Sequence, residues 1–164
     1  MSYISKLLLL ALTISLSSCC SWYGDSSYDL RINTTASMKN VSVEVNIIGI
    51  TESDRLYWQG IKVDDYFGTE VQENSDKVTF QFNQVKQANQ VLYADNAVWD
   101  KWLAKGVKEV YVIAALPGVT TGLPARQDPR VLVIPLDYCK WKADSINIEI
   151  GKNRVYTSTP MLQD

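Results

Sequence analysis

Most of the side chains that could do chemistry in this 164-residue chain are charged or sulfur-bearing, because the chain contains no histidine. Without an imidazole base the usual catalytic triads are excluded, and so are histidine metal sites. The densest acidic group is Asp64-Asp65 with Glu70. Its spacing matches neither an EF-hand nor another set of metal ligands, so we interpret it as a solvated turn and expect no metal and no cofactor.

A second charged group, Asp128-Pro129-Arg130, would place an acid and a base at the end of a loop. We interpret it as a junction between a loop and a strand, in which Pro129 restricts the backbone before it. The serines and threonines lack a histidine partner, and no G-x-S-x-G motif occurs. With 16 basic and 18 acidic side chains, the chain lacks the basic excess of a nucleic-acid-binding protein. These observations favour a protein that is not an enzyme.

Aromatic rings offer a further chemistry, which is stacking on sugars. The candidates are Trp22, Tyr23, Trp58, Trp99, Trp102 and Trp141. Most of them stand at positions expected to pack a core, so a carbohydrate site is the weaker of two hypotheses.

The most specific motif lies in the N-terminal segment. Residues 7–16 form an apolar run that is too short to span a bilayer, which needs about 20 residues, but is typical of a signal peptide. The run ends in Leu16-Ser17-Ser18-Cys19, which resembles a bacterial lipobox: an aliphatic residue, two small residues and then cysteine. We therefore expect cleavage before Cys19, diacylglycerol on its thiol, and an acyl group such as palmitate on its amine.

Cleavage at this site divides the chain into a lipoprotein signal peptide (1–18), a lipidated tether (19–27) and one domain (28–164). Cleavage before Cys20 is disfavoured, because it would put Ser17 where an aliphatic residue is expected. The residue after Cys19 is not aspartate, which by resemblance to enterobacterial sorting favours the outer membrane, facing the periplasm. For Cys139, a disulfide with Cys20 and a buried free thiol are both open.

The elements that must position these residues are mostly short strands. Apolar and polar side chains alternate with a period of two, which is typical of a half-buried antiparallel strand. The pattern predicts strands at 28–33, 41–47, 78–83 and 146–150, with a last short one near Val155. Residues 110–116 and 131–136 are apolar on both faces, which predicts central strands, with Pro135 at a strand end or a bulge.

Two segments depart from the strand pattern. Residues 95–105 predict a helix that Asp95 or Asn96 can cap and Gly106 can close. Residues 56–68 have mixed spacing, which predicts a short helix or turn.

Residues 117–129 contain three prolines and two glycines, which predicts a long exposed loop. Helices do not alternate with strands along the chain, so a parallel α/β fold is disfavoured. The predicted fold class is mainly β: a two-sheet antiparallel β-sandwich with one or two short helices.

The order of these features resembles the outer-membrane lipoprotein of the type VI secretion membrane complex. The matching features follow the lipobox and tether: a strand at 30–32, a polar loop at 33–40, a V-x-V-x-V strand at 41–50, an aromatic and acidic segment at 56–68, an apolar strand at 110–115, Trp141 in a turn, and an I-x-I-x-I strand at 146–150. Together they span most of residues 19–156.

The resemblance implies a transthyretin-like sandwich in a non-enzymatic envelope lipoprotein. Such a protein would anchor a multiprotein secretion complex to the outer membrane and bind the periplasmic domain of an inner-membrane secretion component. The corresponding partner-binding loop contains Thr35, Ser37, Met38, Lys39 and Asn40, with Met38 expected as the apolar anchor. The alternative is a free-standing envelope lipoprotein that binds carbohydrate or peptidoglycan through exposed aromatic side chains.

Overall fold

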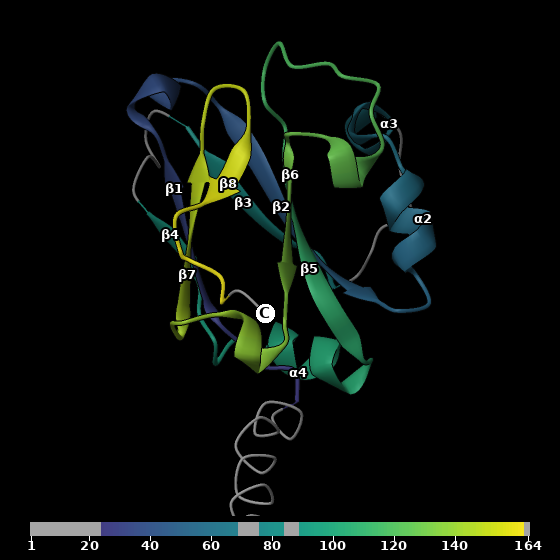
Figure 1. Cartoon of the computed structure of the whole chain (residues 1–164). Coiled ribbons are helices and arrows are strands. Elements are labelled where there is room, and N and C mark those ends of the chain that lie inside the picture. Colours follow the sequence, from purple (N-terminus) through teal and green to yellow (C-terminus); the bar gives the residue numbers. More distant parts are fainter. Residues whose placement is uncertain (1–23, 69–75, 84–88, 163–164) are drawn as a thin grey trace, which may run out of the picture.

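The computed structural model describes residues 24–68, 76–83 and 89–162 (Figure 1). The strands in this part of the chain are β1 (Asp29–Thr34), β2 (Val43–Thr51), β3 (Val78–Phe82), β4 (Gln90–Leu92), β5 (Val107–Ala114), β6 (Val131–Pro135), β7 (Ser145–Ile150) and β8 (Val155–Thr157). The helices are α2 (Arg55–Gly60), α3 (Val63–Gly68) and α4 (Ala97–Ala104), with 3-10 turns η2 (Ala36–Met38), η3 (Ala125–Gln127) and η4 (Tyr138–Lys140).

The strands form two four-stranded sheets, in the orders β4-β1-β7-β8 and β3-β2-β5-β6. The prediction of a mainly β, two-sheet sandwich is confirmed. The expectation of purely antiparallel sheets is wrong for one pair, because β1 and β7 run parallel with Leu30 opposite Ile146. Since β1 leaves its sheet to begin β2 in the other one, its neighbour β7 comes from far along the chain, and no hairpin fixes their relative direction.

The main core lies between the two sheets, where the inward side chains of alternating strands meet. Leu30 and Ile32 of β1 face Val45 and Ile47 of β2 across a layer from which solvent is excluded. Alternation in β1, β2 and β7 therefore predicted the buried face correctly.

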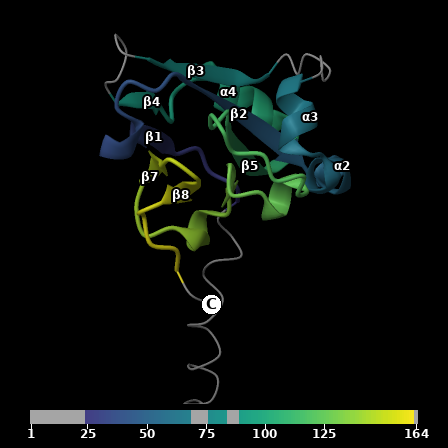
Figure 2. The same cartoon turned by 90° about the horizontal axis from the view of Figure 1, so that it is seen from above.

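A second, smaller apolar cluster covers the outer face of the β3-β2-β5-β6 sheet. Ile48, Ile50 and Tyr111 point away from the main core and pack with Trp58 of α2 and Val63 of α3. Figure 2 shows α2 and α3 beyond β2 and β5, on the side away from β1 and β7. Burial on both faces explains the continuous apolar run of β5, which is a central strand as predicted.

The expectation that residues 131–136 form a central strand is wrong, because β6 is at a sheet edge. Its apolar character has another cause: Val131 and Val133 pack on the second cluster, while Ile134 enters the main core. Pro135 is the last residue of β6, as predicted, where its missing N–H breaks no internal ladder.

The capping prediction for the longest helix is confirmed. The side chain of Asn96 accepts a hydrogen bond from the Val98 N–H at 3.0 Å, and Gly106 closes the helix with a φ of 74°. Residues 56–68 fold into two short helices, α2 and α3, because apolar side chains from both pack on one sheet face.

Candidate functional site

The chain joins the domain at one end of the sandwich, beside η4 and α4, which we call the tether end (Figure 1). Asp25 forms an antiparallel bridge with Asp137, and the Ser26 N–H donates to the Leu136 carbonyl at 2.9 Å. Lys108 forms an ion pair with the Asp25 carboxylate. These contacts fix the chain to the domain from Asp25 onward.

Three connections gather at the opposite end, which we call the far end (Figure 1). They are residues 35–40 between β1 and β2, residues 117–129 between β5 and β6, and residues 151–154 between β7 and β8. The first and third are neighbours, because the Thr35 N–H donates to the Ile150 carbonyl at 3.0 Å. Chain entry and loops thus lie at opposite poles of a rigid scaffold.

The loop of residues 35–40 does not present Met38 to solvent. The Met38 side chain is 2% exposed and belongs to the main core, so it does not form the apolar anchor that was expected. η2 turns this side chain inward, and burying it at the open end of the sandwich removes apolar surface from water. Ser37, Lys39 and Asn40 are exposed and Thr35 is half-buried, so partner binding by these four stays a prediction.

The loop of residues 117–129 is tied down by a buried group of charges. Arg130 donates to both oxygens of Asp128 at 3.0 and 2.7 Å, and to Asp64 of α3 and the Val119 carbonyl at 2.7 and 2.8 Å. The Asp128 side chain is fully buried and that of Arg130 nearly so. The expected solvated turn is therefore wrong for Asp64, which is helical and paired, and the expected exposed loop is anchored at its end.

Glu70, the third member of the expected acidic group, lies outside the described residues. Sequence reasoning noticed the Asp128–Arg130 pair but missed its link to Asp64, which is 66 positions away. No local pattern carries that information.

Electrostatics keeps this cluster ionised. The hydrogen bond from Arg130 lowers the pKa of Asp64. Burial alone would raise the pKa of Asp128, but hydrogen bonds from Arg130 and Thr121 outweigh it and hold that pKa below its ordinary value. The hydrogen bond to Asp128 in turn raises the pKa of Arg130. The cluster is built to hold fixed charges and not to exchange protons near neutral pH.

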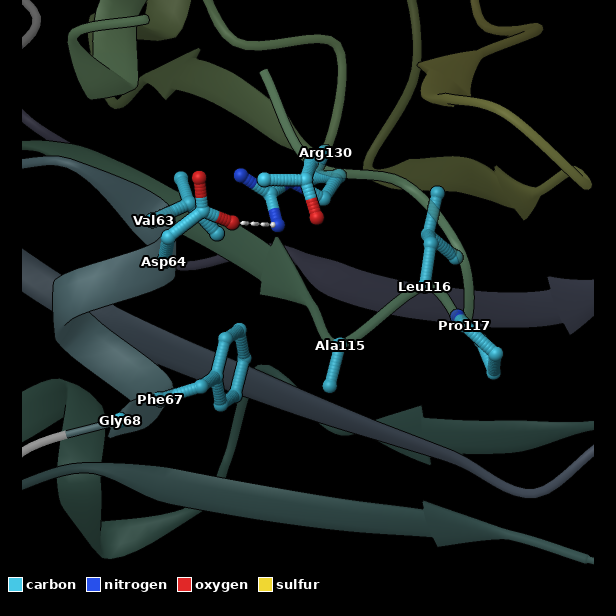
Figure 3. Close-up of a pocket in the computed structure, with 9 residues that line it drawn as sticks. Val63, Asp64, Phe67, Gly68, Ala115, Leu116, Pro117 and Arg130 are labelled. Atoms are coloured by element: carbon cyan, nitrogen blue, oxygen red, sulfur yellow. Dashed lines mark hydrogen bonds and ion pairs between the residues drawn. The ribbon is translucent and has the colours of Figure 1, made fainter. Parts of the chain in front are cut away.

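An open cleft of about 440 Å³ lies beside the cluster (Figure 3). Phe67 of α3 and the segment Ala115 to Pro117 supply apolar walls, and Asp64 and Arg130 bound its other side. These two charges face each other and are already joined by a hydrogen bond. The two charged side chains that line the cleft are therefore paired with each other.

The tryptophans of the described residues do not form a sugar-stacking surface. Trp58, Trp99, Trp102 and Trp141 are all buried. Three of their indole N–H groups donate to backbone carbonyls, those of Trp99, Trp102 and Trp141. Trp22 and Tyr23 lie outside the described residues. The exposed aromatic side chains are dispersed: Tyr57 is in α2, Tyr93 is in the connection between β4 and α4, and Tyr138 is in η4.

Cys19 and Cys20 also lie outside the part of the chain that the structure describes, so lipid attachment stays a prediction. Cys139 is disulfide-bonded, which removes the alternative of a buried free thiol. Within residues 24–68, 76–83 and 89–162, no three acidic or cysteine side chains are grouped to hold a metal ion. No helix in those ranges has the length and apolarity to cross a membrane.

Comparison with known proteins gives likenesses in structure only: no family model matches the sequence, and no curated protein does. The chain is similar to the C-terminal domain (869–1107) of the type VI secretion protein TssM from EAEC, with 14% identity over 80% of this chain and 98% of that one, at a TM-score of 0.49. It is similar to Serratia marcescens Lip, a membrane-bound component of the type VI secretion system, with 13% identity over 82% and 98% of the two chains, at 0.47.

A third similar structure is the type VI secretion lipoprotein TssJ1 from Pseudomonas aeruginosa, with 7% identity over 85% of this chain and all of that one, at a TM-score of 0.49. Each likeness combines low identity with a TM-score below 0.5.

Proposed function

We propose that this chain is a non-enzymatic envelope lipoprotein that anchors a type VI secretion complex to the outer membrane. Acyl chains on Cys19 hold the tether end at the inner face of that membrane, and the far end binds the periplasmic domain of an inner-membrane component. The observation that carries the proposal is the placement of the chain entry and the loops at opposite poles of the sandwich.

The lipobox supports the anchoring half of the proposal. Three acyl chains on one residue bury more apolar surface than the two signals that stable anchoring needs. Asp25, which is bridged to Asp137, stands only six positions after Cys19, so a lipid on Cys19 holds the tether end close to the bilayer. The far-end loops then point into the periplasm, away from the membrane that holds the lipid.

The charge of the far end supports the binding half. Lys39, Lys152 and Arg154 are exposed, and residues 35–40 and 151–154 contain no acidic side chain. The guanidinium of Arg154 lies 4.9 Å from the centre of the Tyr156 ring, which holds this charge in place. The three charges form a basic rim on two adjacent loops. We infer that the partner presents an acidic surface to it.

Charge reversal at the far end tests this proposal. Lys39→Glu with Lys152→Glu should weaken pull-down of the periplasmic partner domain about tenfold. Its difference from a neutral pair, Lys39→Gln with Lys152→Gln, should shrink as the salt concentration rises, because salt screens the repulsion. The matched control is Lys101→Glu with Lys142→Glu, two exposed lysines at the tether end. Equal weakening by both charge-reversed pairs, or by neither, contradicts the assignment of the binding surface.

A further inference from the structure

Cys139 provides a second covalent link that the lipobox alone does not predict. It is disulfide-bonded, and the chain has three cysteines. The other two are Cys19 and Cys20, so within one chain its partner is one of these neighbours.

The described contacts bring Asp25 close to the segment that contains Cys139. Asp25 forms an isolated antiparallel bridge with Asp137. Cys139 stands two positions after Asp137, in η4. Cys20 stands five positions before Asp25, a stretch that spans at most about 18 Å when extended. A disulfide between Cys20 and Cys139 is therefore within the reach of the intervening residues.

We propose that Cys139 is bonded to Cys20, so that the residue next to the lipidated cysteine is stapled to the domain. The choice of Cys20 rests on the proposed function, because a Cys19 thiol that carries diacylglycerol forms no disulfide. The bond forms by oxidation of the two thiols: they lose two protons and two electrons to an oxidised dithiol protein of the periplasm, which becomes reduced.

The staple removes the free tether. The acylated residue and the stapled residue are consecutive, so their Cα atoms are about 3.8 Å apart. η4 is then held at the membrane surface, and with it the exposed side chains Tyr138, Met161 and Leu162. The last two are clamped beside η4, because Met161 bridges Trp141 and the Leu162 N–H donates to the Lys140 carbonyl at 2.9 Å. Amphipathic and apolar groups at this place suit the interface of a bilayer.

Thiol trapping in the full chain identifies the partner. In Cys19→Ser, Cys20 and Cys139 should stay paired, so a maleimide added to the unreduced, unfolded protein should not react. In Cys20→Ser, Cys139 should react. Trypsin without reductant should join the peptide of residues 131–140 to the peptide that ends at Arg31. The reverse pattern of reactivity, or a Cys139 that reacts in the unchanged protein, overturns the proposal.

A cleavage experiment tests the staple in the membrane. A site-specific protease sequence inserted after Ser21 is cut in isolated membranes. The domain should stay bound after cutting and be released by dithiothreitol, whereas in the same protein with Cys20→Ser cutting alone should release it. Release of the unsubstituted domain without reductant overturns the staple. Thiol trapping in Cys19→Ser detects the Cys20–Cys139 disulfide whether or not Cys19 carries a lipid in the unchanged protein. A missing lipid anchor and a missing disulfide are therefore distinguishable.

Discussion

At the tether end, α4 closes the core with aromatic side chains, whereas at the far end a buried ion cluster ties the longest loop to α3. Trp99 and Trp102 meet edge to face with ring centroids 5.1 Å apart and are excluded from water. Arg130, by contrast, connects Asp128 to Asp64 through charged hydrogen bonds. The first arrangement gains its stability from apolar burial, which does not depend on pH, and the second depends on ionisation.

The two ends of the domain show how one scaffold can serve two tasks. The end that we place at the membrane is closed by packing and by the chain entry at Asp25. The end that we place toward the partner needs loops of fixed shape with polar surfaces. A buried cluster fixes the base of residues 117–129 and leaves the exposed basic side chains of the neighbouring loops available for contact.

The largest expected effect on stability is at the tether end. Trp102→Ala should lower the free energy of unfolding by about 3–5 kcal/mol, because it empties a large buried site. Trp102 also packs directly on Gly49, where an added Cβ would lie 2.8 Å from the indole. Urea unfolding at pH 5 and pH 7 measures the loss, which should be the same at both. A loss below 1 kcal/mol would contradict the packing described for this end.

At the far end, Arg130→Met should cost about 3 kcal/mol at pH 7, because it leaves the buried Asp128 carboxylate without its cation. The lowered pKa of Asp128 adds stability above the unfolded-state pKa of about 4, and this contribution is lost as the pH falls through the folded-state value. In the variant, burial instead raises the pKa of Asp128. The difference in unfolding free energy between the two proteins should therefore narrow as the pH falls, beginning at the raised pKa of Asp128 in the variant and continuing below about pH 4.

Urea unfolding of the unchanged and Arg130→Met proteins from pH 3 to pH 7 measures this narrowing. Asp128→Asn is the companion variant, because it removes the ionisable group and keeps the shape. A gap between unchanged protein and Arg130→Met that is constant over this range would show that the cluster acts through packing and not through charge.

A smaller effect is expected from the cap of α4. Asn96→Ala should destabilise the protein by about 1 kcal/mol, since it removes the acceptor for the Val98 N–H at the start of the helix. Asn96→Asp keeps an acceptor and should restore most of the loss. Thermal unfolding compares the three proteins, and equal stability of Asn96→Ala and the unchanged protein would show that the cap contributes nothing.

The smallest effect on stability is expected from the far-end charges. Lys39→Glu with Lys152→Glu should change the free energy of unfolding by less than about 0.5 kcal/mol, because both side chains are exposed. The same urea measurement checks this. A larger loss in the free energy of unfolding would mean that this variant binds its partner more weakly because it is less well folded, and not because the binding surface has changed.

Patterns in the sequence predicted the features that depend on near neighbours. Alternation marked β2 and β7, and the pair Asn96 and Gly106 marked both ends of α4. The predictions that were wrong concern features that depend on residues far apart in the chain. The parallel direction of β1 against β7 joins residues 116 positions apart, as in Asn33 opposite Glu149.

In the candidate site, too, contacts between near neighbours were predictable from the sequence and contacts between distant residues were not. The Asp128–Arg130 pair was visible as two nearby charges, but its third member, Asp64, comes from another element. Met38 stands in a polar segment, which suggested a solvent-facing role, yet η2 directs it into the core of the sandwich. Side-chain direction in a short turn is decided by the sheets around it, which no local spacing encodes.

We propose that a lipid on Cys19 holds this domain at the outer membrane. The most direct measurement is metabolic labelling with a palmitate analogue, followed by separation of inner membrane, outer membrane and soluble periplasm, for the unchanged chain, Cys19→Ser and Cys20→Ser. Label and outer-membrane retention are expected for the unchanged chain and for Cys20→Ser, and both should be lost in Cys19→Ser. Retention of Cys19→Ser in the outer membrane at the unchanged level would contradict this proposal.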